Sequence, residues 1–159
     1  MNEAEHRRAF EDLPDKHHES PEHGMLPPET PWEPPDGNVV LERVPDFDQG
    51  LNMGDQLVHW VRTNVRWSVV SHSPDGFEFS YGGSGPADLS LNLLNMFVPP
   101  WTDNREPVQC FEGEASATAW ELHQKFKAGV IANAPWEGGT LSGTKIREWI
   151  EERMEEIQQ

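Results

Sequence analysis

The chain has a single cysteine, Cys110, among its 159 residues, and only four of its 12 basic residues are lysines. One cysteine cannot form a disulfide within the chain, so no disulfide framework supports the fold and an intracellular setting is expected. No apolar run reaches about 18 residues, the length of a membrane-spanning helix. The N-terminal residues also lack the basic-then-apolar order of a secretory signal peptide. We therefore expect a soluble, cytoplasmic protein, in the host cytoplasm if the source is viral.

Positive charge is scarce throughout the chain. Twenty-eight acidic residues stand against 12 basic ones, which gives a formal net charge of −16. Such a field repels nucleic-acid phosphates and anionic lipid, so neither a nucleic-acid partner nor a membrane is expected. The acids gather near the N-terminus and in the last predicted helix rather than along one continuous face, which argues against mimicry of DNA. Salt adaptation, a viral origin and an ordinary acidic protein all fit this composition.

The first 36 residues differ in composition from the rest. They contain seven of the 14 prolines, four of the seven histidines and ten acidic residues, but few large apolar residues. Such a segment cannot bury enough apolar surface to offset the entropy lost on ordering. We predict a disordered acidic tail over residues 1–36 and a single domain over 37–159, with an oligomeric state that the sequence leaves open.

Alternating apolar residues predict a small antiparallel sheet. A strand is expected near residues 38–44, and a β-hairpin over 65–81, where Ser73-Pro74-Asp75-Gly76 has the pattern of a type I turn. A short helix is expected from Asp55 to Asn64.

Three further helices are predicted downstream, from Pro86 to about Phe97, over 114–132 and over 144–158, each with an apolar stripe. The order of elements indicates an α+β fold, in which a small antiparallel sheet packs against three to four helices.

The most informative stretch is the corner between the hairpin and the following helix, Gly82-Gly83-Ser84-Gly85-Pro86. Glycines allow a sharp bend and a close approach to another surface, and a helix start presents free N–H groups to an anion. Ser84 adds a hydroxyl and Tyr81 an aromatic wall. We therefore predict a binding module, not an enzyme, for a small polar or anionic ligand such as a nucleotide or metabolite. The residues predicted to form the site are Tyr81, Gly82, Gly83, Ser84, Gly85, Asp88 and Asn92, flanked by Asn95.

Other interpretations of this corner stay open. It matches neither a Walker loop, nor a dinucleotide fingerprint, nor a nucleophile elbow, because each lacks a residue on which its mechanism depends. In a purely structural role, Pro86 starts the helix and Asp88 complements the dipole in its first turn, where its charge would weaken anion binding. A third interpretation is a hydrolase, with His72 across the hairpin as the base for Ser84. No catalytic residue, cofactor or metal is assigned.

Gly82 to Leu94, with the preceding Asp75-Gly76-Phe77-Glu78-Phe79, resembles an uncharacterised domain family of bacteria, archaea and tailed phages. The hallmark of that family is Phe-Glu-Trp-Gly-Tyr-Gly-Gly-Ser-Gly-Pro-Ala-x-Leu-Ala-Leu. Here Phe79 and Ser80 replace its Trp-Gly, and Ser90 replaces its last Ala. The resemblance covers about residues 38–152 and implies a common fold and a common corner. It implies no reaction, and it makes an accessory phage protein a natural expectation.

A protein partner is the alternative function. The acidic tail and the apolar stripe of the last helix are both suited to recruiting one. Trp32, Trp101 and Trp136 lie in predicted connections, where they either clamp loops onto the core or act as exposed anchors. His17, His18 and His23 have metal-type side chains, but they lie in the tail, where no scaffold is expected to hold them.

Overall fold

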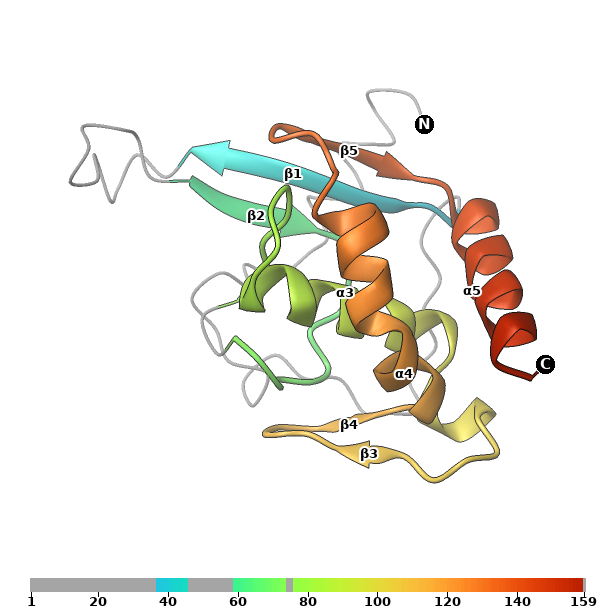
Figure 1. Cartoon of the computed structure of the whole chain (residues 1–159). Coiled ribbons are helices and arrows are strands. Elements are labelled where there is room, and N and C mark those ends of the chain that lie inside the picture. The colour runs from blue at the N-terminus through green and yellow to red at the C-terminus, as the bar shows by residue number, and fades with distance from the viewer. Residues whose placement is uncertain (1–36, 46–58, 74–75, 159) are drawn as a thin grey trace.

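The computed structural model describes residues 37–45, 59–73 and 76–158 (Figure 1). These residues form a three-stranded antiparallel sheet, a two-stranded hairpin and three α-helices, which confirms the predicted α+β class. The predicted tail, residues 1–36, lies outside the described residues. No helix in the described part of the chain is long and apolar enough to cross a membrane.

The larger sheet is built around β1 (Val39–Pro45), the strand predicted near residues 38–44. It pairs antiparallel with β2 (His59–Thr63) on one side and with β5 (Gly138–Leu141) on the other. The helix predicted from Asp55 to Asn64 is wrong for residues 59–63, which form β2, and its first part lies outside the described residues. A short helix with few apolar positions is only marginally stable, whereas the same residues as a strand form a full ladder of hydrogen bonds with β1.

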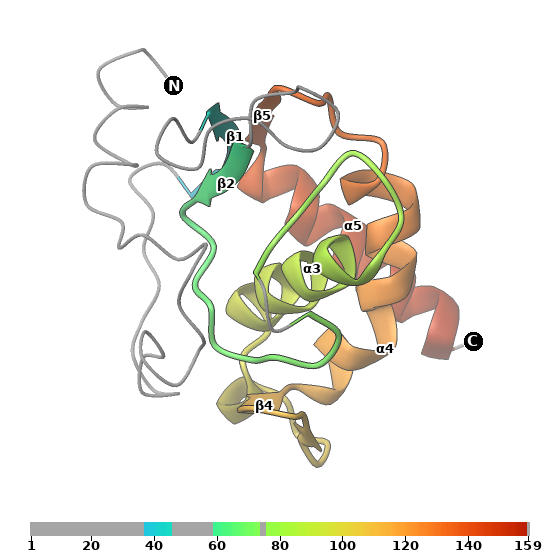
Figure 2. The same ribbon diagram turned by 90° about the vertical axis from the view of Figure 1, so that its left-hand side faces the viewer.

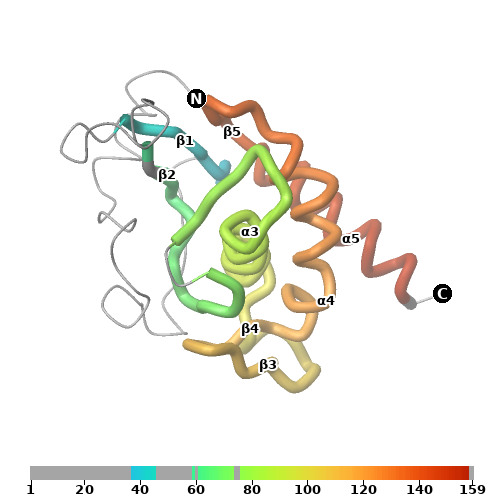
Figure 3. Tube along the Cα trace, turned by 60° about the vertical axis from the view of Figure 1, so that its left-hand side comes forward, coloured from blue at the N-terminus to red at the C-terminus, as the bar shows by residue number. Residues whose placement is uncertain are grey.

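The central element is α3 (Ser84–Phe97), which is buried from Gly85 to Asn95. Figure 3 looks nearly along this helix and shows the sheet above it, α4 and α5 to one side, and the β3–β4 hairpin below. A helix enclosed in this way must be apolar on most of its surface, as the leucines at 89, 91, 93 and 94 show. Figure 2 shows the same enclosure from another side.

The other predicted helices are present with shifted ends. The helix predicted over 114–132 is α4 (Ala117–Phe126), capped by Ser116 and continued by a π-helical turn, η2 (Lys127–Ile131). The last helix, α5 (Gly143–Gln158), matches the prediction for 144–158. The sequence did not indicate β5, the 3₁₀ turn η1 (Pro100–Thr102), or the short strands β3 (Val108–Gln109) and β4 (Glu114–Ala115).

The β-hairpin predicted over 65–81 is wrong for the residues of that stretch that the structure describes, 65–73 and 76–81. Neither arm belongs to a strand, and only Val70 makes a strand-like contact, an isolated bridge to Glu112. The alternation nevertheless has its expected effect on burial, since Val65, Trp67 and Val69 all face the core. The backbone of this segment bonds to side chains of α3 instead of to a second strand.

Candidate functional site

Asp88 of α3 binds the backbone of the neighbouring segment. Its carboxylate accepts hydrogen bonds from the amides of Ser71 (3.2 Å), His72 (3.0 Å) and Ser73 (2.8 Å), and its side chain is fully buried. A buried carboxylate is tolerated only when hydrogen bonds satisfy its charge, and three amides do so here. The negative charge of Asp88 therefore stabilises the 71–73 turn by accepting these hydrogen bonds.

Asn92, one turn later, repeats this role. Its Oδ1 accepts from the amides of Ser68 (2.7 Å) and Val69 (3.0 Å), while its Nδ2 donates to the carbonyls of Val69 (2.9 Å) and Asp88 (2.8 Å). All the hydrogen-bonding capacity of a carboxamide is used in this way. Asn92 is thus a structural link between α3 and the 65–73 segment.

Asn95 completes the row. Its Nδ2 donates to the carbonyl of Glu114 (3.1 Å), and its Oδ1 accepts from the amide of Ser116 (2.8 Å), at the start of α4. Asp88, Asn92 and Asn95 are spaced by four and three residues, so they lie on one face of α3. We call these three residues the polar row. Its spacing within an otherwise apolar helix is the sequence signal that could have revealed it.

The structure therefore divides the predicted site. Tyr81, Gly82 and Ser84 are exposed and Gly83 is half-buried, so these four lie together at the surface. Gly85 is buried beneath them. Asp88 and Asn92, with the flanking Asn95, lie in the interior, where the polar row binds the protein's own backbone.

The helix start itself differs from the prediction. Gly83 is the N-cap of α3 and provides no side-chain hydrogen bond, and Ser84 is the first helical residue. Pro86 is therefore the third helical residue, and Asp88 is the fifth. As a result, the first turn of α3 has no acidic residue. The prediction that Asp88 lies in the first turn and weakens anion binding there is therefore wrong.

Close packing explains two of the corner glycines. A Cβ on Gly83 would come 2.7 Å from Cε2 of Tyr81, because that ring lies against the glycine. A Cβ on Gly85 would come 2.8 Å from the Cβ of Glu78. A Cβ on Gly82 would meet no atom within 4 Å, so packing does not require a glycine at this position.

Arg43 of β1 fixes the segment before the corner. Its guanidinium donates to both carboxylate oxygens of Glu78 (2.9 Å each), to the carbonyl of Phe79 (3.1 Å) and to the carbonyl of Trp136 (2.9 Å). It also lies over the rings of Phe79 and Trp136. In addition, the amide of Ser80 donates to the carbonyl of Ile131, in the π-helical turn (3.0 Å). These contacts attach the segment before the corner to β1 and to the π-helical turn. Sequence reasoning missed them.

The base proposed for Ser84 has a different partner. Nε2 of His72 lies 3.0 Å from Nε2 of His123, on α4, and no hydrogen bond joins Ser84 to a histidine among the described residues. Burial raises the pKa of the Cys110 thiol, with a further contribution from Asp88, so this cysteine is not activated. Within the described residues, Ser84 therefore has no histidine as a base, and the pKa of Cys110 is raised rather than lowered.

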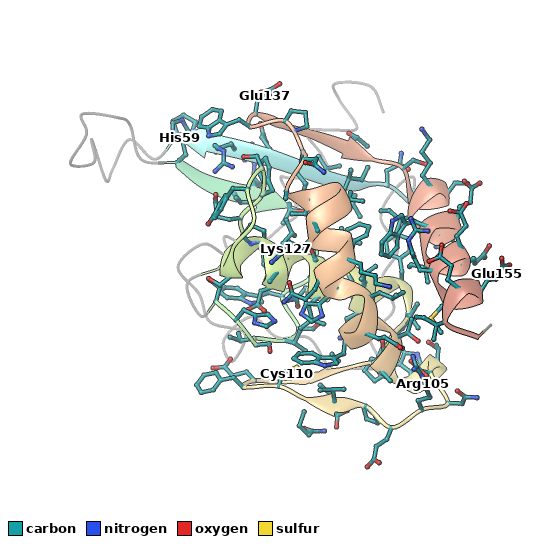
Figure 4. All side chains as sticks on the ribbon, viewed as in Figure 1. His59, Arg105, Cys110, Lys127, Glu137 and Glu155 are labelled. Carbon is teal, nitrogen blue, oxygen red and sulfur yellow. The ribbon has the colours of Figure 1, made fainter. Side chains whose placement is uncertain are left out.

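Metal-type side chains do not cluster in residues 37–45, 59–73 and 76–158, where no three His, Cys, Asp or Glu side chains meet in a way that could hold a metal ion. Figure 4 shows the labelled residues of this kind in separate parts of the fold, with Cys110 in the β3–β4 hairpin and His59 at the start of β2. His17, His18 and His23 lie outside the described residues.

The fold and site together define a small α+β domain in which one central helix binds a strandless segment through its polar row and begins at the surface. A family model described as "Family of unknown function (DUF6166)" matches residues 49–152, and the chain belongs to this family. The match includes the glycine-rich corner and the whole of α3. No curated protein and no solved structure matches the chain.

Proposed function

We propose that the protein is a non-enzymatic binding module that takes a small anion at the corner formed by Tyr81, Gly82, Gly83 and Ser84. One observation carries the proposal, namely that α3 starts at the surface, where Gly82 and Ser84 are exposed, with no side-chain cap and no acidic residue in its first turn. Two carboxylates near this turn are already bound within the protein, since that of Asp88 accepts from the 71–73 amides and that of Glu78 pairs with Arg43.

The chemistry of such a turn favours a phosphate or carboxylate group. The amides of Gly82, Gly83, Ser84 and Gly85 have no hydrogen bond within the described part of the chain, and α3 is 14 residues long. Unpaired N–H groups and the positive end of the helix dipole together attract an anion. The exposed Ser84 hydroxyl supplies a further donor, and the half-exposed ring of Tyr81 supplies a flat apolar wall for a base or ring.

Net charge sets the size of the ligand. A formal charge of −16 repels a long polyanion at every phosphate, whereas a small ligand interacts mainly with the local field of the corner. A mononucleotide or a phosphorylated metabolite therefore suits the site better than a nucleic acid.

Two substitutions of Ser84 test the proposal by calorimetric titration with inorganic phosphate and a panel of nucleotides and metabolites. Ser84→Asp places a carboxylate where the ligand would lie, so binding is lost, while the helix gains about 0.3–1 kcal/mol from its dipole. Ser84→Ala, the matched control, keeps the amides and loses at most one hydrogen bond. Absence of binding by the parent protein across the whole panel would refute the site.

A second candidate is protein–protein interaction, supported by the exposure of large aromatic side chains. Phe111, at the tip of the β3–β4 hairpin, is 79 % exposed, and Trp101 and Trp136 are both about half exposed. Aromatic residues in such positions are typical binding anchors. The accessory phage role belongs to this candidate, with the tail and α5 as further contact regions. Deleting residues 1–36 separates the two functions, because it removes tail-dependent partner capture and leaves binding at the corner unchanged.

A further inference from the structure

The contact between His72 and His123 joins two parts of the molecule that have few other polar links. His72 belongs to the 71–73 turn, which Asp88 holds, and His123 lies on α4. Their Nε2 atoms are 3.0 Å apart, and the ring of Trp120 stacks on that of His72. The ring centroids are 5.2 Å apart, so the centroid separation is longer than the nitrogen–nitrogen distance. The difference is about twice the distance from the centre of an imidazole ring to its nitrogen. The two nitrogens therefore face each other along one line.

The surroundings fix the tautomer of His123, which in turn sets that of His72 while both rings are neutral. Nδ1 of His123 lies 2.6 Å from the carbonyl oxygen of Trp120, which can only accept, so Nδ1 carries a hydrogen. In neutral His123, Nε2 is then an acceptor, and the hydrogen between the rings must belong to Nε2 of His72. This arrangement is an N–H···N hydrogen bond. The hydrogen on Nε2 of His72 points at the lone pair on Nε2 of His123, so that lone pair is not available to a metal ion.

The contact has room for one hydrogen only. A single added proton gives one positive charge, which the two rings can share in an N–H···N hydrogen bond if His72 moves its own hydrogen to Nδ1. If both rings were protonated, two N–H donors and two positive charges would face each other at the same short distance. Burial lowers the pKa of His123, and the charges of His72 and Lys127 act in the same direction. The hydrogen bond to the Trp120 carbonyl and the charge of Asp88 act in the opposite direction but do not outweigh them. The groups that face His123 thus come from the 65–73 segment, α3, α4 and the π-helical turn.

We propose that His72 and His123 form an acid-released latch, which holds the 71–73 turn against α4 while at least one of the two rings is neutral and releases it when both rings are protonated. Release separates His72 from both His123 and Trp120, so the stacked face of the Trp120 ring becomes exposed. The 71–73 turn then keeps its bonds to Asp88 but loses its attachment to α4.

The pH range follows from the direction of the shift. An unfolded histidine titrates near about pH 6.5, and folding lowers the pKa of His123 below that value. The latch is therefore closed above about pH 6.5, and its contribution is lost at lower pH, as both rings become protonated. Over this range, the opening constant rises by up to about tenfold for each pH unit.

Imidazole NMR of the full-length protein tests the fixed tautomers directly. At pH 7.5 the ¹⁵N spectrum should show the hydrogen of His123 on Nδ1 and that of His72 on Nε2. His123 should remain neutral at pH values where an exposed histidine is already half protonated. A His123 that carries its hydrogen on Nε2, or that titrates at or above the ordinary histidine value, would overturn the proposal.

Tryptophan fluorescence and amide exchange of Ser71, His72 and Ser73 test the release. Between pH 7.5 and 5, exchange corrected for the intrinsic rate should accelerate in the parent protein. His123→Gln keeps a neutral acceptor and should abolish this acceleration, whereas His59→Gln, on β2, should leave it unchanged. The same acceleration in His123→Gln would overturn the proposal. If that variant does not fold, the tautomer measurement on the parent protein still decides the matter.

Discussion

Asp88 accepts hydrogen bonds from three consecutive backbone amides in the interior of the protein. This single side chain does two things at once, because it orders the 71–73 turn and it withdraws a negative charge from the start of α3. A sequence can show an Asp near a helix start, but it does not show which way the side chain points. Packing therefore decides whether such an Asp interacts with the helix dipole or accepts hydrogen bonds from a neighbouring backbone.

Asp88→Asn should destabilise the protein strongly. The substituted amide can accept through one oxygen only and turns its NH₂ group toward backbone donors, which leaves buried N–H groups unpaired at about 1–3 kcal/mol each. Urea denaturation should show a loss of about 2–4 kcal/mol in the free energy of unfolding. Glu148→Gln, an exposed carboxylate on α5, is the control and should change stability by less than about 0.5 kcal/mol. Equal stability of the two variants would show that Asp88 does not hold the turn.

At the scale of single elements, α3 determines what its neighbours can be. The alternation of residues 65–69 predicted a strand, and the apolar positions do face the core. The strand does not form because Asn92 takes the amides of Ser68 and Val69. Periodicity reports which side chains are buried, but the partner of a buried backbone comes from another element, which periodicity cannot show.

The two ends of the glycine corner should respond differently to a methyl group. Gly85→Ala places a Cβ 2.8 Å from the Cβ of Glu78 and 3.3 Å from its backbone nitrogen, so it should cost about 1–3 kcal/mol despite the better helix propensity of alanine. Gly82→Ala meets nothing within 4 Å and needs no positive φ, so it should be neutral or stabilise the fold by up to about 1 kcal/mol. Thermal denaturation of both variants measures this contrast, and a costly Gly82→Ala with a neutral Gly85→Ala would contradict the packing described for the corner.

At the scale of the whole molecule, the α+β class, β1 and the three α-helices follow from composition and periodicity. The short strands β3, β4 and β5 do not, because two to four residues carry too little pattern and their pairing depends on distant partners. The same limit applies to the candidate site. The glycines, Ser84 and Tyr81 were evident from the sequence, whereas Arg43 and Ile131, which support the corner, are 35 or more residues away from Glu78 and Ser80 along the chain.

Mapping of a bound anion on the amide spectrum tests the central claim most directly. Titration of the ¹⁵N-labelled full-length protein with phosphate and mononucleotides should shift the amide signals of Gly82, Gly83, Ser84 and Gly85. The signals of Ser71, His72 and Ser73 should stay in place, because Asp88 already occupies those amides. Shifts that gather around Phe111 and Trp101 instead, or an unchanged spectrum for every ligand, would contradict the account.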